Sequence, residues 1–159
     1  MTVLIRKARP DDIGALADLL IGLGWFQRYF EAASEAVIRA RVGQHLGQCL
    51  ADQSHSVYVA EGAAGQVDGY IAVHWLPYLF MPGPEGYISE LFVREAARGQ
   101  GLGSQLLAAV KEEAQARGCT RLALINIRSR ESYQRGFYSR LGWEERPQAA
   151  NFILRLPEE

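Results

Sequence analysis

The chain has 159 residues, the size of one domain with a sizeable core at roughly 150 residues per domain. Apolar residues make up 48% and charged residues 22%, which excludes disordered and collagen-like chains. A net charge of −1 gives no overall field that attracts phosphate backbones or anionic lipid, so we expect neither a nucleic-acid nor a membrane partner.

The apolar segments are too short for export or membrane insertion. Residues 3–5 cannot form the apolar core of a secretory signal, and the window 70–80 falls short of the roughly 20 residues that span a bilayer. Cys49 and Cys119 are too few for a disulfide framework, which fits a reducing compartment. We therefore expect a cytoplasmic protein.

The N-terminal third predicts one strand and two helices. Residues 3–8 fit a strand, and a helix beginning near Pro10 carries apolar residues at helical spacing until the glycines at 22 and 24. A second helix is expected over 34–51, with Ser34 as its N-cap.

The middle of the chain predicts three antiparallel strands. Residues 56–61 and 67–76 fit strands joined by a turn at 62–65, and 86–93 fits a third strand that ends where charge returns.

The last third changes to alternating strand and helix. A helix over 101–117 followed by a strand over 121–127 completes a parallel βαβ unit. A further helix with apolar residues four apart from 133 to 141 should stop at Gly142, and 151–156 should form the last strand. The predicted fold is α/β, a mixed and mostly antiparallel sheet with one parallel βαβ unit and helices on both faces.

A glycine-rich turn, RGQGLG at 98–103, lies between the predicted third strand and the βαβ helix. A helix N-terminus presents free N–H groups and the positive end of its dipole, so this turn fits a phosphate, although a plain tight turn has the same glycines. Ser104 replaces the lysine that a phosphate-binding GxxxxGK[ST] loop needs. The glycine spacing does not fit GxGxxG, and Thr120 and Arg121 stand where a dinucleotide site needs an acidic residue, so NAD is disfavoured.

The turn and its flanks resemble the GNAT superfamily of acetyl-CoA-dependent N-acetyltransferases. Arg98, Gly101 and Gly103 match its [QR]xxGx[GA] motif at a strand-to-helix turn. ISELFV at 88–93 is similar to the family's fourth strand, and FYSRLGW at 137–143 is similar to its late FY..LGF segment.

The resemblance implies a GNAT-like acyl-CoA N-acyltransferase fold and bound acetyl-CoA. One departure concerns Glu131, which stands where many members have a cofactor-contacting asparagine, so Asn126 or Ser132 is left to replace it. The implied pantetheine contacts lie beside Leu91, Phe92 and Val93, where this strand would splay from its parallel neighbour. The implied pyrophosphate contacts are the backbone N–H groups of Arg98, Gly99, Gln100, Gly101, Leu102, Gly103 and Ser104.

Acetyl transfer to an amine needs a neutral nucleophile, a stabilised oxyanion and a proton for the leaving thiolate. Tyr138 matches the family tyrosine that protonates the sulfur, whereas a plain core tyrosine is the alternative. Glu90 alternates with Ile88 and Phe92, so we expect it on a strand face that is otherwise apolar, where partial desolvation would raise the pKa of its carboxylate toward that of a useful base. A base or an ammonium binder is the functional interpretation, and an ion pair with an arginine is the alternative.

His74 shares a strand face with Tyr70 and Ala72 and is a second candidate base or a packed histidine. A backbone N–H near Phe92 or Val93 would suffice as the oxyanion donor.

Two other sequence patterns do not indicate a specific reaction. His45 and Cys49 are four apart on a helix but lack further ligands nearby, so no metal is expected. The aromatic residues within 25–30 and 78–81 fit an acceptor-pocket wall, a homodimer interface or simple packing.

The sequence thus predicts an N-acetyltransferase that moves acetyl from acetyl-CoA to a primary amine in a ternary complex. A CoA-binding sensor or scaffold without turnover is the alternative. A polyamine, an aminoglycoside, an amino acid and a protein amine all remain open as the acceptor.

Overall fold

The computed structural model describes residues 2–157 and divides the chain into two compact units, with the division after Ile125. That the whole chain forms a single domain stays a prediction.

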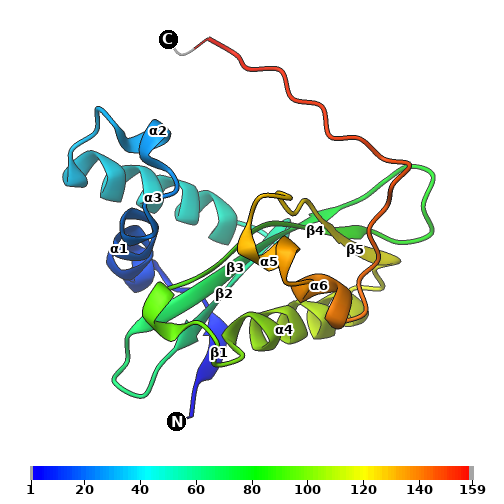
Figure 1. Ribbon diagram of the computed structural model, residues 1–159, viewed down its shortest axis with the longest axis horizontal. Coiled ribbons are helices and arrows are strands. Elements are labelled where there is room, and N and C mark those ends of the chain that lie inside the picture. Colours follow the sequence, from blue (N-terminus) through cyan, green and yellow to red (C-terminus); the bar gives the residue numbers. More distant parts are fainter. Residues whose placement is uncertain (1, 158–159) are drawn as a thin grey trace. The chain divides into compact units, whose positions relative to one another are not determined.

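The first unit contains one sheet of five strands in the order β1-β2-β3-β4-β5 (Figure 1). Neighbouring strands are antiparallel except β4 and β5, which are parallel as the βαβ pattern predicts. The strands are β1 (Leu4–Lys7), β2 (His55–Glu61), β3 (Val67–Leu76), β4 (Glu85–Val93) and β5 (Arg121–Leu124).

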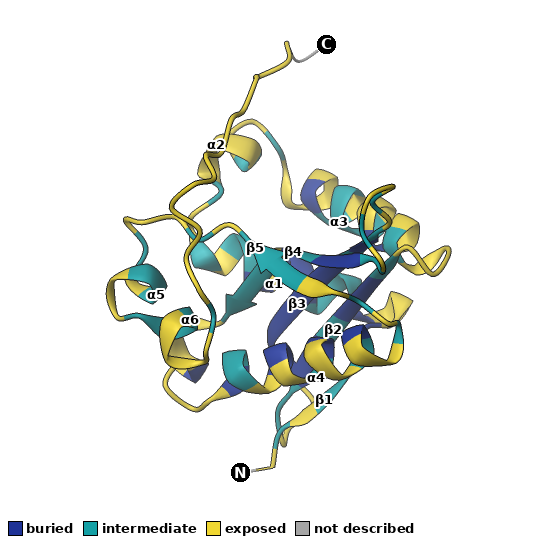
Figure 2. Cartoon of the chain, turned by 90° about the vertical axis from the view of Figure 1, so that its right-hand side faces the viewer, coloured by how far each residue is buried: buried dark blue, intermediate teal, exposed yellow. Residues whose placement is uncertain are grey.

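Helices cover both faces of this sheet, as predicted. Helices α1 and α3 pack on one face, against β3 and β2, and α4 lies on the other face (Figure 1). The buried residues of α4 turn toward the strands (Figure 2). The helices are η1 (Pro10–Asp12), α1 (Ile13–Leu23), α2 (Gln27–Phe30), α3 (Glu35–Leu50), η2 (Glu95–Ala97) and α4 (Leu102–Ala116).

Local sequence signals fix the ends of these helices. The N–H of Val37 donates to Ser34 Oγ at 3.3 Å, so Ser34 caps α3 as predicted. Gly24 ends α1 in the left-handed conformation, with φ of 69°. Along α4, the side chains of Leu106 and Val110 are fully buried, because residues four apart share the face toward the sheet.

The second unit contains two one-turn helices, α5 (Glu131–Gln134) and α6 (Phe137–Arg140). The prediction of one continuous helix is wrong here. Gly136 has φ of 67°, a left-handed conformation that interrupts helical hydrogen bonding between the two turns.

Two strand predictions are also corrected. β5 ends at Leu124 and not at 127, where its pairing with β4 stops. Residues 151–156 form no strand, and the side chains of Phe152 and Leu154 are 91% and 85% exposed. A strand needs a partner backbone as well as a run of strand-forming residues, and this segment has none within residues 2–157.

None of the helices within residues 2–157 has the length and apolar character that crossing a bilayer requires.

Candidate active site

The glycine turn leads from β4 into α4 through η2. Gly99 and Gly101 both have φ of 79°, which only glycine adopts readily. Gly101 is the N-cap of α4, and no side chain caps that helix end. The first N–H groups of α4 therefore have no side-chain acceptor, which suits an anionic group of a ligand.

A Cβ added at either glycine would meet little of the protein. Apart from the chain neighbours of each glycine, no atom of residues 2–157 lies within 4 Å of that position at Gly99, and at Gly101 the nearest is Gln105 Nε2 at 4.0 Å. The space beside the turn is therefore open to a ligand.

Strand β4 continues past its partner β5. Their pairing runs from Glu85–Arg121 to Ile88–Leu124, whereas β4 extends to Val93. Within residues 2–157, no strand pairs with the side of 91–93 that faces away from β3. An extended, amide-rich ligand can bind such a free strand edge.

A β-bulge in β4 changes the face on which Glu90 lies. Ala72 of β3 pairs with Glu90 and Val73 pairs with Ile88, which leaves Ser89 as the extra residue. Residues directly opposite each other share a face, so Glu90 and Ile88 lie on opposite faces of the sheet. The expectation that Ile88, Glu90 and Phe92 share one face is therefore wrong for Ile88. Glu90 and Phe92 do share a face, because they pair with Ala72 and Tyr70.

The Glu90 carboxylate is half-buried on the face that α1 and α3 cover. The Tyr70 hydroxyl donates to Glu90 Oε1 at 2.9 Å. Burial raises the pKa of Glu90, while the Tyr70 hydrogen bond and the nearby His45 oppose the increase. The raised pKa makes the Glu90 carboxylate a better proton acceptor than an exposed glutamate.

His74 lies beside Ser89. Its Nε2 is 2.8 Å from Ser89 Oγ, and its ring centroid is 4.5 Å from that of His55 on β2. Burial and the neighbouring His55 lower the pKa of His74. The imidazole is therefore neutral at pH 7, as a base must be before it accepts a proton.

Aromatic rings from the segment after α1 pack on the end of β4. The ring centroids of Trp25, Phe26 and Tyr70 lie 5.8, 5.2 and 5.8 Å from that of Phe92. The Arg98 guanidinium lies 5.1 Å from the Trp25 ring centroid, a cation–π contact. These rings connect the glycine turn to the face that carries Glu90.

The second unit holds the other predicted site residues. Tyr138 is half-buried and contacts the rings of Phe137 and Trp143, with centroids at 4.9 and 5.8 Å. Burial raises the pKa of Tyr138 to about 12. Ser132 Oγ donates to Asn126 Oδ1 at 3.1 Å, so the two candidates for the missing family asparagine contact each other.

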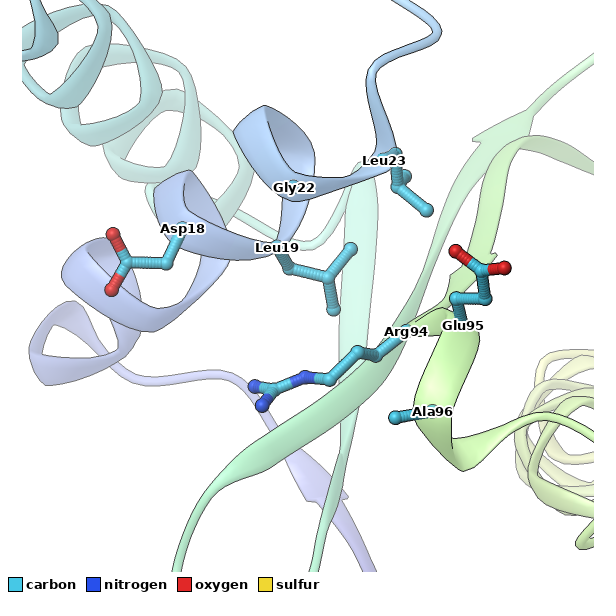
Figure 3. A pocket seen from close by; sticks show the side chains of 7 residues that line it. All are labelled: Asp18, Leu19, Gly22, Leu23, Arg94, Glu95 and Ala96. Carbon is cyan, nitrogen blue, oxygen red and sulfur yellow. The ribbon is translucent and has the colours of Figure 1, made fainter.

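A hollow of about 680 Å³ lies between α1 and the segment that follows β4 (Figure 3). Leu19 and Leu23 point from α1 toward the segment 94–96. None of the predicted site residues lines it. The lining residues are Asp18, Leu19, Gly22, Leu23, Arg94, Glu95 and Ala96.

Within residues 2–157, no three His, Cys, Asp or Glu side chains are grouped so as to hold a metal ion.

Sequence reasoning missed Tyr70, Ser89 and His55 as parts of this site. Tyr70 was within reach of prediction, since period-two alternation on β3 places it on the same face as His74. Ser89 was not, because nothing in the local sequence marks the bulge.

Comparison with known families gives a match to the acetyltransferase (GNAT) family model over residues 23–143, which is most of the chain. The chain belongs to the GNAT family. Its match includes the glycine turn, β4 and the FY segment that carried the sequence resemblance.

Two curated relatives of this GNAT chain are acetyltransferases of small molecules. The aminoglycoside N(6')-acetyltransferase type 1 of Stenotrophomonas maltophilia is 30% identical over 96% of this chain and 93% of the relative. The L-methionine sulfoximine/L-methionine sulfone acetyltransferase of Pseudomonas paraeruginosa is 38% identical over 59% of this chain. That match spans about half of the relative, 54% of its length.

A solved structure described as a transcriptional regulator from Bacillus halodurans C-125 has the same fold. Its TM-score is 0.83 at 25% identity, and the match covers 98% of this GNAT chain and 100% of that chain.

Proposed function

We propose that this chain transfers the acetyl group of acetyl-CoA to a primary amine by direct attack in a ternary complex. GNAT membership and acetyltransferase relatives support this activity. The observation that carries it is the uncapped start of α4 behind two left-handed glycines, beside the free edge of β4. These two features supply N–H donors for a pyrophosphate and a strand edge for an amide-rich arm.

The proposed acetyl-CoA contacts follow from this geometry. The backbone of 98–104 would hold the pyrophosphate, and 91–93 would bind the pantetheine arm. Asn126 and Ser132, which are hydrogen-bonded to each other, are proposed to replace the family asparagine at Glu131. No metal takes part in this proposal.

Tyr138 is the proposed acid for the leaving thiolate. A tyrosine hydroxyl keeps its proton at neutral pH and can donate it to the thiolate. Burial raises the pKa of Tyr138 to about 12, so the hydroxyl also stays protonated at alkaline pH. Glu90 and His74 are the proposed groups that bind and deprotonate the acceptor ammonium, since both lie on the α1 and α3 face of the sheet.

The proposed acceptor is a small-molecule or protein amine that binds on this same face. Trp25, Phe26 and Phe92 supply apolar surface for its body, and Glu90 supplies one negative charge for its ammonium group. The aminoglycoside and methionine sulfoximine relatives make small molecules the first acceptors to test.

A cytoplasmic location and a homodimer belong to the same proposal. Leu79 and Phe80, in the uncharged loop between β3 and β4, are 107% and 80% exposed, which supports self-association. Sedimentation equilibrium measures the oligomeric state directly.

The test of the activity is thiol release from acetyl-CoA with a panel of amines: kanamycin, spermidine, L-methionine sulfoximine, L-lysine, phenethylamine and a lysine peptide. Turnover with any of these amines supports the proposal. CoA binding without turnover on any of them favours a CoA-binding sensor. That second candidate gains weight from the structural likeness to a protein described as a transcriptional regulator.

A further inference from the structure

The bulge in β4 puts two consecutive polar side chains on one face of the sheet. Tyr70 and His74 share a face of β3, because their positions differ by an even number. Tyr70 donates to Glu90 at 2.9 Å, and His74 Nε2 lies 2.8 Å from Ser89 Oγ. The carboxylate and the Ser89 hydroxyl therefore both lie on the face that α1 and α3 cover.

Polar groups continue from His74 to solvent. The ring of His55 lies 4.5 Å from that of His74, centroid to centroid. His55 Nδ1 is 2.7 Å from Ser54 Oγ, which donates to Asp52 Oδ1 at 2.5 Å. Ser54 and Asp52 are exposed, so this polar cluster beside His74 reaches solvent.

Besides His74 and Tyr70 of β3, the titratable groups around Ser89 and Glu90 come from β2, β4 and α3. His55 of β2 and Tyr87 of β4 face His74, with the Tyr87 centroid 6.3 Å away. His45 and Cys49 of α3 face Glu90, and burial followed by the Glu90 charge raises the pKa of Cys49. Cys49 therefore stays a neutral thiol, and the imidazole is the group here that accepts a proton readily.

We propose that Ser89 and His74 remove the proton from the acceptor ammonium while Glu90 binds that ammonium. This division of roles rests on the proposed acetyltransferase function. It adds Ser89 to the site and separates binding of the charge from removal of the proton.

The proton transfer balances as follows. The ammonium N–H bond breaks and its proton bonds to Ser89 Oγ, while the Ser89 hydroxyl proton bonds to His74 Nε2. The amine keeps the electron pair with which it attacks the acetyl carbon. The resulting imidazolium, which has a lowered pKa and a second histidine beside it, then releases its proton to water.

The first arm of the test needs no turnover. In the full chain labelled with ¹⁵N-histidine, NMR at pH 7.5 should show His74 Nε2 without a proton, accepting from Ser89. Its resonance should shift in Ser89→Ala. A protonated His74 Nε2 would overturn the relay whether or not any amine is acetylated, which keeps this outcome distinct from failure of the proposed function.

The second arm is kinetic and uses the panel amine that turns over fastest. Ser89→Ala and His74→Ala should each lower kcat/KM for the amine by about 100-fold, the lower range for a general base, with the KM for acetyl-CoA unchanged. Added imidazole should restore part of the His74→Ala rate. The matched control is the double variant Ser89→Ala/His74→Ala, which should lose no more rate than either single variant, because both residues act on the same proton transfer.

Two kinetic results would overturn the proposal. One is a near-wild-type rate for Ser89→Ala. The other is an acetyl group found on Ser89 itself by mass spectrometry, because Ser89 would then be a covalent acyl carrier and not a proton relay.

Discussion

At the scale of single residues, Glu90 combines a half-buried carboxylate with one tyrosine hydrogen bond. Its raised pKa makes the folded state hold a proton at pH values where the unfolded chain has already lost it. Stability conferred by this group therefore falls as pH rises from the usual glutamate range through the raised pKa. Above that pH, the buried charge is a cost to the fold that an uncharged side chain would not have.

Glu90→Gln should therefore raise the melting temperature at pH 8 and lower kcat/KM for the amine. This increase in melting temperature should become smaller as pH falls, and it should vanish below the usual glutamate pKa. Calorimetry of both proteins from pH 4 to pH 8 measures this difference. An equal or larger gain at pH 4 would contradict the raised pKa.

Tyr138 gives a second prediction at this scale. Tyr138→Phe removes one hydroxyl and keeps the ring contacts with Phe137 and Trp143, so acetyl-CoA affinity should stay near wild type. If the hydroxyl protonates the thiolate, kcat should fall by roughly ten- to ten-thousand-fold. Steady-state kinetics with calorimetric binding separates the two effects.

A matched control is Tyr133→Phe in the same unit. Like Tyr138→Phe, this variant loses one tyrosine hydroxyl and keeps the ring. The Tyr133 hydroxyl donates to the Glu145 carboxylate, so the variant loses that one hydrogen bond. Its kcat should be unchanged. Equal rates for both variants would remove Tyr138 from the acid role.

At the scale of elements, Gly101 in the glycine turn can be compared with Gly65, a glycine in another turn that has nearly the same φ angle. Gly101 at the start of α4 has φ of 79° and Gly65 in the β2–β3 turn has φ of 80°, with no atom closer than 4.0 Å to an added Cβ at either position. Alanine at either should cost a similar roughly 1–2 kcal/mol of stability, because the backbone strain is the same.

Only Gly101→Ala should also weaken acetyl-CoA binding, by about tenfold or more, since a methyl group there occupies space that the phosphates need. Titration calorimetry of both variants measures the affinity, and thermal unfolding confirms that their stabilities match. An unchanged affinity in Gly101→Ala would mean that the turn does not hold the cofactor.

Elements with local signals were predicted well. The Ser34 cap and the strands 67–76 and 86–93 agree with the structure within one residue, because capping and alternation act over a few positions. Elements that depend on a distant partner strand, or on the backbone conformation of a single residue, were predicted wrongly. Gly136 could sit in a helix or break it, and 151–156 carries strand-forming residues without a strand to pair with.

The parts of the site were also predictable only where their signals are local. The turn at 98–104 could be located from sequence, since its glycines and its place before a helix are local features. The bulge at Ser89 could not, because it is visible only in the register between β3 and β4. Its consequence is the correction that matters most for chemistry, since it brings Ser89 and Glu90 onto one face.

At the scale of the whole molecule, the open turn and free strand edge imply that the ligand contributes to stability. A ligand that binds only the folded chain at 100 times its Kd adds about 2.7 kcal/mol to the free energy of unfolding. For a chain of 159 residues, each kcal/mol corresponds to roughly 2–4 °C in Tm.

Saturating CoA should therefore raise the Tm by about 5–10 °C, measured by scanning calorimetry in the presence of CoA at 100 times its Kd. NAD⁺ is the control ligand: it carries the same kind of pyrophosphate without a pantetheine arm, and the turn lacks the dinucleotide glycine spacing. At the same concentration NAD⁺ should shift the Tm by much less, because it leaves the free edge at 91–93 unfilled. Equal shifts with CoA and NAD⁺ would show that the turn binds any pyrophosphate and that the strand edge plays no part in recognition.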